Sequence, residues 1–140
     1  MMYSMVDADQ NMSHAPRERY VLVADDDAGT RRLFEGLIVG LGAKVTLTTS
    51  GEEALATMSP GSSVHSPDMI FLDMRMPNLD GIKTAHAFRE QGYKGPIFIF
   101  TSGATLEKKK ESEVAGVTRF FSKTVLKKDL LRALLEEYAK

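Results

Sequence analysis

Cysteine is absent from this chain of 140 residues, and its absence excludes several chemistries. Disulfide bonds, thiolate nucleophiles and cysteine-ligated metal centres cannot form. An excess of charge of one sign is also lacking, because 18 basic and 19 acidic side chains leave a net charge of −1. This balance gives no reason to expect attraction to nucleic acid or to an acidic membrane surface. We therefore expect no direct nucleic-acid binding, and we expect a cytoplasmic protein, with which the lack of cysteine is compatible.

Long hydrophobic runs are lacking as well. No apolar run approaches the ~20 residues of a membrane-spanning helix, so we expect no membrane insertion. The first residues lack a basic start followed by an apolar block and do not resemble a secretory signal. We interpret residues 1–18 as a flexible N-terminal tail. The composition, 43% hydrophobic and 26% charged, is that of an ordinary globular protein, and we expect one domain at residues 19–140.

Short apolar runs alternate with segments of helical periodicity along that domain. The expected strands are Tyr20–Ala24, Lys44–Thr49, Asp68–Leu72, Pro96–Phe100 and Val117–Ser122. The expected helices are Ala28–Leu41, Gly51–Met58, Ile82–Gln91, Leu106–Ala115 and Val125–Tyr138. Five strands alternating with five helices predict a parallel sheet covered by helices on both faces. This alternation does not determine the order of the strands in the sheet.

Polar residues at the helix starts fit this interpretation. Ser50 has the position of an N-cap, and Glu53 follows three residues later, which is a capping-box pattern. Asp27 is expected to cap the first helix or to lie in its first turn. Asp80 is expected to shape its turn with Gly81 and not to bind a metal. We therefore assign these acidic residues structural roles.

Other polar side chains follow the expected strands at the point where each strand ends. Asp25 and Asp26 follow the first strand, Asp73 the third, Thr101 the fourth and Lys123 the fifth. The carboxyl ends of parallel strands share one edge of the sheet, so we expect these side chains to converge there. Two bare carboxylates ~4 Å apart repel by about 4 kcal/mol at an effective dielectric near 20. A proton, the lysine or a divalent cation must offset this repulsion.

This set of groups fits phosphoryl transfer. Oxygen ligands beside a phosphate favour Mg²⁺, which prefers octahedral oxygen coordination. One carboxylate could attack phosphorus and become an acyl phosphate. The ammonium and the hydroxyl could hold phosphoryl oxygens. Because phosphoryl transfer depends mainly on placement and charge neutralisation, the predicted edge supplies what the reaction needs.

Four stretches carry a resemblance to a known family: Val23–Asp27, Phe71–Gly81, Phe100–Gly103 and Phe121–Lys123. In type and in order they resemble the receiver domain of bacterial two-component response regulators, the CheY-like superfamily. The resemblance extends over roughly residues 19–138. It implies an α/β fold, a flavodoxin-like (βα)5 three-layer sandwich whose five-stranded parallel sheet has the order 2-1-3-4-5.

The resemblance also implies a role for each acidic residue at the strand ends. Asp73 would accept a phosphoryl group from a phosphohistidine on a sensor histidine kinase or a phosphotransfer protein. Asp25 and Asp26 would hold Mg²⁺, with Asp73 and the backbone carbonyl of Arg75 as further ligands. The chain would catalyse only its own aspartyl phosphorylation and dephosphorylation, so we expect a signalling switch and not an enzyme with other substrates.

The remaining roles implied by the resemblance come with two departures. Thr101 would be the switch hydroxyl, Lys123 the phosphate-binding ammonium and Phe120 the switch aromatic residue. The family commonly has Tyr where this chain has Phe120, which cannot donate a hydrogen bond. The family usually has Pro after the lysine, but Thr124 stands there. A cis bond before a residue other than proline costs ~2.5–4 kcal/mol, so we expect the Lys123–Thr124 bond to be trans.

Phosphorylation would add about −1.5 to −2 charges to the strand end. We expect Thr101 to move toward the phosphoryl group and Phe120 to fill the space left behind. The surface formed by Leu106–Ala115, Val117–Ser122 and Val125–Tyr138 would then change its affinity for a downstream protein or a second copy of the chain. A coupling free energy of ~1–3 kcal/mol would suffice.

The resemblance also implies where the kinase docks: near the first helix, around Arg31, Arg32 and Glu35. Two alternatives come from other classes of protein. One is a receiver-like interaction module that no longer signals by phosphorylation, which Thr124 and Phe120 would favour. The other is a phosphatase that uses an aspartyl phosphate, but the chain has no evident substrate-capping insertion or separate general acid. The chain could be a complete single-domain regulator or a piece of a larger protein.

Overall fold

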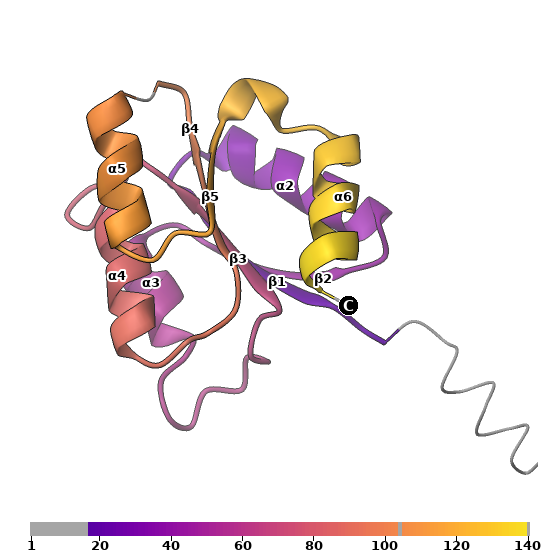
Figure 1. Ribbon diagram of the computed structural model, residues 1–140. Coiled ribbons are helices and arrows are strands. Elements are labelled where there is room, and N and C mark those ends of the chain that lie inside the picture. Colours follow the sequence, from indigo (N-terminus) through magenta and orange to yellow (C-terminus); the bar gives the residue numbers. More distant parts are fainter. Residues whose placement is uncertain (1–16, 104, 140) are drawn as a thin grey trace, which may run out of the picture.

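The computed structural model describes residues 17–103 and 105–139, and these form one sheet between two layers of helices (Figure 1). The strands are β1 (Tyr20–Ala24), β2 (Lys44–Thr48), β3 (Met69–Asp73), β4 (Ile97–Thr101) and β5 (Arg119–Ser122). All are parallel, in the order β2-β1-β3-β4-β5. The helices are α2 (Ala28–Gly40), α3 (Gly51–Ala56), α4 (Gly81–Glu90), α5 (Leu106–Val114) and α6 (Lys128–Tyr138). The flavodoxin-like (βα)5 sandwich and its strand order are thus confirmed.

Burial on both faces explains why the central strands are continuous apolar runs. Every residue of β3 and β4 is buried. Alternate side chains point to opposite faces, because the side-chain period of a strand is two residues. Toward α3, α4 and α5 point Leu22, Ile70, Leu72, Ile97 and Ile99. Toward α2 and α6 point Val21, Val23, Phe71, Phe98 and Phe100. Each large apolar side chain buried in this way contributes roughly 1.5–3 kcal/mol to folding.

The caps expected at Asp27 and Ser50 are present, and Asp80, which was expected only to shape its turn, also caps a helix. Asp27 Oδ2 accepts a hydrogen bond from the Thr30 amide at 2.8 Å, and Asp80 Oδ1 accepts one from the Lys83 amide at 2.8 Å. Ser50 Oγ likewise accepts from the Glu53 amide at 3.0 Å. The Glu53 carboxylate reaches back to the amide of Thr49, one residue before the N-cap, at 2.6 Å. These caps set the starts of α2, α3 and α4.

The last third of the domain differs from the predicted boundaries. The expected strand Val117–Ser122 begins later, at Arg119, because the Val117 amide closes the end of α5 by donating to Ser112 O at 2.9 Å. The expected helix Val125–Tyr138 is divided into a 3-10 turn, η1 (Lys123–Val125), and α6. The backbone is extended at Leu126, whose side chain packs into the core below α2 and α6.

Two further expectations concern the chain as a whole. Among the described residues, no helix has both the length and the apolar character needed to cross a membrane. Of the expected tail at residues 1–18, residues 1–16 lie outside the described part of the chain, so the flexible tail stays a prediction. Arg17 is described, and its guanidinium forms an ion pair with Asp68 at 2.8 Å beside the start of β1.

Candidate functional site

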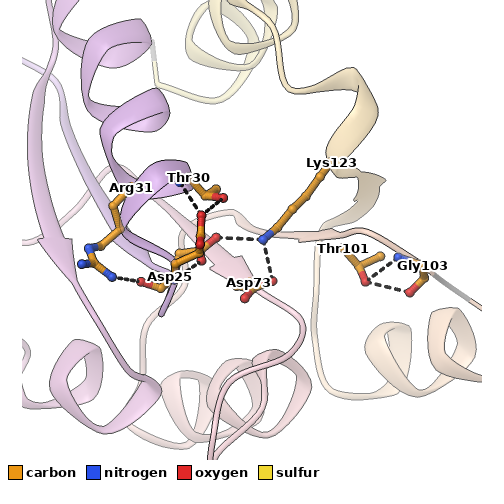
Figure 2. A network of polar contacts seen from close by, with 8 residues as sticks. Asp25, Thr30, Arg31, Asp73, Thr101, Gly103 and Lys123 are labelled. Atoms are coloured by element: carbon orange, nitrogen blue, oxygen red, sulfur yellow. Dashed lines mark hydrogen bonds and ion pairs between the residues drawn. The ribbon is translucent and has the colours of Figure 1, made fainter.

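Three groups from three separate segments meet at the carboxyl edge of the sheet (Figure 2). The Lys123 ammonium lies 3.1 Å from Asp25 Oδ2 and 3.1 Å from Asp73 Oδ1. Asp26 joins them, because one carboxylate oxygen each from Asp25, Asp26 and Asp73 lie within 4.8 Å of one another. The convergence predicted from the strand ends is therefore observed for these four residues.

Asp25 is held firmly by its surroundings. It directly follows β1, and its amide donates to Thr48 O on the neighbouring strand at 3.1 Å. Its Oδ1 accepts from the Asp27 amide at 2.9 Å, and its backbone carbonyl accepts from the Arg31 guanidinium at 2.8 Å. The residue is fully buried. Its Oδ1 is thus held by the N-cap of α2, and its backbone by β2 and by Arg31 of α2.

Asp73 is the last residue of β3, and a glycine allows the chain to turn back tightly behind it. The loop after β3 returns to start α4 at Gly81, whose amide donates to Met74 O at 2.9 Å. A Cβ on Gly81 would collide with the backbone carbonyl of Asp73. Asn78, in the same loop, has a φ of 68°, in the left-handed region that Asn tolerates. The tight return keeps Asp73 at the edge of the sheet.

The site carries more negative than positive charge. Burial and the nearby Asp25 charge raise the pKa of Asp73 from 3.8 to about 6, although Lys123 and the Arg75 backbone amide oppose that shift. Burial lowers the pKa of Lys123, but its ion pairs with Asp25 and Asp73 outweigh burial and raise that pKa overall. Lys123 is therefore charged, while Asp73 gains a full negative charge only above its raised pKa.

The carboxylates of the site outnumber its cationic groups. Asp25 Oδ2 is buried, and among the described residues its partner is the Lys123 ammonium at 3.1 Å. Three carboxyl groups face this one ammonium. Three carboxylates that share a single ammonium leave negative charge unbalanced, and their oxygen ligands fit a hard divalent cation such as Mg²⁺.

The Thr101 hydroxyl is directed into its own loop (Figure 2). It donates to Gly103 O at 2.7 Å and accepts from the Gly103 amide at 3.2 Å. The side chain is buried at the end of β4. The expected switch hydroxyl therefore lies at the predicted edge, but its one proton is engaged by Gly103.

The other predicted site residues lie around this centre. Phe120 on β5 is partly buried against the core under α5 and borders a hollow of about 280 Å³. Arg75 is exposed and lines a cleft of about 920 Å³ between the loops that follow β3 and β4. The metal-binding role of its backbone carbonyl stays a prediction. The Lys123–Thr124 bond is trans, as expected.

Sequence reasoning assigned Arg31 a docking role and did not foresee its contact with Asp25. The only signal was position: Arg31 follows the N-cap Asp27 by four residues, so it lies one turn into α2. The reasoning also missed the hydroxyl of Ser122, which contacts the Thr124 amide beside Lys123. Neither contact belongs to a periodic pattern of apolar residues, so hydrophobic spacing could not reveal it.

Comparisons with known proteins agree with this geometry. The family profile described as "Response regulator receiver domain" matches residues 21–135. Two-component response regulator 24 of Arabidopsis thaliana is 33% identical over 113 residues, which are 81% of this chain and 79% of that protein. Histidine kinase 2 of the same plant is 40% identical over 81 residues, 58% of this chain. The chain matches only 7% of the length of that kinase.

A solved structure is also similar. It is the receiver domain of sensor histidine kinase PA1611 from Pseudomonas aeruginosa PAO1, described with a magnesium ion coordinated in the active site cleft. It is 25% identical, with a TM-score of 0.74 over 87% of this chain and 98% of that one. The fold and the acidic edge are those of a receiver-type α/β domain. This chain belongs to the response regulator receiver domain family of two-component systems.

Proposed function

We propose that the chain is a phosphorylation switch in which Asp73 accepts a phosphoryl group in a reaction that depends on Mg²⁺. The observation that supports this most strongly is the bridge formed by the Lys123 ammonium, 3.1 Å from both Asp25 and Asp73, at the edge of the sheet. A cation placed between a buried acidic residue and a partly desolvated nucleophile is suited to holding phosphoryl oxygens. Two-component relatives supply the signalling context.

The transfer itself requires the ionised form of Asp73. A carboxylate oxygen of Asp73 forms a bond to the phosphorus of a phosphohistidine, and the P–N bond breaks. The bonding electron pair stays on the imidazole nitrogen, which takes up a proton. Lys123 balances charge on the phosphoryl oxygens, and the buried position of Asp25 fixes the direction from which the ammonium approaches. Hydrolysis of the acyl phosphate by water returns the carboxylate.

Asp25, Asp26 and Asp73, with the backbone carbonyl of Arg75, are the groups that would hold Mg²⁺. When bound, the cation would neutralise part of the charge of the cluster and of the incoming phosphoryl group. The excess of three carboxylates over one ammonium supports this assignment, because a cation would balance the remaining negative charge.

The readout of the switch is a change at the surface formed by α5, β5 and α6. Thr101 donates its proton to the phosphoryl group, and Phe120 responds by repacking against the hollow under α5. The phosphoryl donor is a sensor histidine kinase or a phosphotransfer protein in the cytoplasm, docking near Arg31, Arg32 and Glu35. A downstream protein or a second copy of the chain binds the α5–β5–α6 surface.

Intact mass measurement tests the proposal. The protein is incubated with Mg²⁺ and phosphoramidate, which is a small phosphoryl donor, and the mass is followed over time. We expect one phosphoryl adduct that Asp73→Asn abolishes and that Asp129→Asn, a change at an exposed acidic residue of α6, leaves intact. A folded wild-type protein that forms no adduct would overturn the proposal and favour an interaction module. Continuous release of phosphate from many esters would instead indicate a phosphatase.

A further inference from the structure

Lys123 lies at an unsupported point of the backbone. It directly follows β5, and β5 is the edge strand of the sheet, paired only with β4. The last residue pair in that register is Thr101 with Ser122, so sheet pairing stops one residue before the lysine. A lysine side chain also has large rotamer freedom. Something other than the sheet must fix the backbone from which the ammonium extends.

The hydroxyl of Ser122 supplies that support. Its Oγ accepts a hydrogen bond from the Thr124 amide at 3.2 Å and lies 2.9 Å from the Thr124 hydroxyl. Ser122 is thereby the N-cap of η1, the 3-10 turn that begins at Lys123. At the other end of this turn, the Leu126 amide donates to Lys123 O at 3.1 Å, and Leu126 is buried.

We propose that Ser122 is a positioning residue for the Lys123 ammonium, acting by capping the turn that carries the lysine. Thr124 is its partner: the amide of Thr124 provides the bond that a proline at this position could not make. The cap holds the lysine backbone from one side, and Asp25 and Asp73 hold the ammonium from the other. The functional part of this inference rests on the proposed role of Lys123 in phosphoryl transfer, but the positioning can be measured without it.

The chain offers a matched control. Ser62, in the loop between α3 and β3, accepts from the Val64 amide at 3.1 Å, with the same two-residue spacing and in an exposed setting. Ser62→Ala therefore removes the same kind of local bond at a position outside the acidic cluster. Ser122→Thr keeps a hydroxyl at the cap and is the conservative rescue. Thr124→Ala removes the contact between the hydroxyls and leaves the amide donor in place.

Two measurements test the proposal on the full chain. The first is the ¹⁵Nζ–¹H signal of the Lys123 ammonium, which is observable when ion pairs slow its proton exchange. We expect Ser122→Ala to broaden or remove this signal, and Ser122→Thr and Ser62→Ala to retain it. The second is the initial rate of adduct formation with phosphoramidate and Mg²⁺. We expect Ser122→Ala to lower this rate about threefold to tenfold, in the range that loss of an N-cap hydroxyl produces in a local equilibrium. Thr124→Ala should have a smaller effect of the same sign.

An unchanged ammonium signal together with a wild-type rate in Ser122→Ala would overturn the proposal. So would an equal loss of rate in Ser62→Ala, because the effect would then be one of general stability. If the wild-type protein takes up no phosphoryl group, the proposed function fails, and the ammonium spectra alone still decide whether Ser122 positions Lys123. If Ser122→Ala does not fold, Thr124→Ala tests the contact between the two hydroxyls alone, and a wild-type ammonium signal with a wild-type rate in that variant would count against the proposal.

Discussion

The Thr101 hydroxyl gives its only proton to the carbonyl oxygen of Gly103, two residues along the same loop, at 2.7 Å. A hydroxyl has a single donor, so Thr101 cannot bind Gly103 O and a phosphoryl oxygen with the same proton. The two arrangements exclude each other. Such an exclusive pair of contacts is a suitable basis for a two-state element, because phosphorylation would favour one arrangement over the other.

The first prediction concerns this hydroxyl. Thr101→Ala should still take up a phosphoryl group, because Asp25, Asp73 and Lys123 are untouched, but it should lose the accompanying change in α5 and β5. Amide ¹H–¹⁵N spectra with and without phosphoramidate measure that change. A coupling free energy of ~1–3 kcal/mol means that phosphorylation changes the affinity for the partner five- to 150-fold. In Thr101→Ala we expect this ratio of affinities to be close to one. Thr101→Ser should retain the shifts. If phosphoramidate changed the amide chemical shifts of α5 and β5 in Thr101→Ala as much as in the wild-type protein, the proposed role of this hydroxyl would be refuted.

A second prediction follows from the pKa of Asp73, which is raised from 3.8 to about 6 in the folded protein. A raised pKa means that the fold favours the protonated acid, so this group contributes stability below about pH 4 that is lost as the pH rises through 6. The shift corresponds to roughly 3 kcal/mol. Asp73→Asn should therefore stabilise the metal-free protein by up to about 3 kcal/mol at pH 8 and by much less at pH 4.

Urea unfolding in the presence of a chelator, repeated across this pH range, measures the effect. Asp129→Asn, at an exposed residue, should leave the pH dependence of stability almost unchanged. Equal stabilisation by Asp73→Asn at both pH values would contradict the assignment, because the gain would then not arise from the charge of the carboxylate.

The strands and the acidic edge could be predicted because buried strands have a simple sequence pattern. β3 and β4 are covered on both faces, so each is an uninterrupted apolar run, and the polar residue at its end is conspicuous. The division between η1 and α6 has no corresponding pattern in the sequence. Leu126 is apolar and lies at helical spacing from Leu130, although its backbone is extended, so a periodic pattern joined the turn to the helix.

The hydrogen bonds that support the site could not be predicted from the sequence pattern either. The bond from Arg31 to the Asp25 carbonyl and the bond from the Thr124 amide to Ser122 join a side chain to a specific backbone atom. Such contacts depend on the local backbone geometry of a loop or a turn, which the pattern of apolar residues does not specify. Residue type and spacing identify the candidates for phosphoryl chemistry, but they do not show which neighbours hold those candidates in place.

The third prediction concerns the metal. A ligand that binds only the folded state stabilises it by about 2.7 kcal/mol at 100 times its dissociation constant. We expect Mg²⁺ to raise the free energy of unfolding of the wild-type protein in this way, and more at pH 8 than at pH 5, because protons compete for Asp73, whose pKa is about 6.

Asp25→Asn should lose most of this gain from Mg²⁺. The substitution keeps an Oδ1 that can accept from the Asp27 amide, so the start of α2 is preserved while the negative charge is removed. Asp129→Asn again serves as the matched acidic control. The metal assignment would be wrong if Asp25→Asn were stabilised by Mg²⁺ as strongly as the wild-type protein.

The fourth prediction compares two glycines with opposite surroundings. Gly81 starts α4 against the Asp73 carbonyl, and a Cβ there would collide with that backbone. Gly36 lies inside α2 with open space where a Cβ would be, and its φ is not in the left-handed region. We expect Gly81→Ala to destabilise the protein by about 1–3 kcal/mol, as overpacking does, and Gly36→Ala to stabilise it by about 0.5–1 kcal/mol, as in other helix interiors.

Urea unfolding measures both changes, and the phosphoramidate reaction adds a second readout. Gly81→Ala must move either α4 or the end of β3, and moving the end of β3 displaces the Asp73 carboxylate from the Lys123 ammonium. Its rate of adduct formation should therefore fall even under conditions in which the variant is fully folded, while Gly36→Ala should react at the wild-type rate. A folded Gly81→Ala variant that reacts as fast as the wild type would show that the tight return of the loop supports the fold without setting the position of the phosphoacceptor.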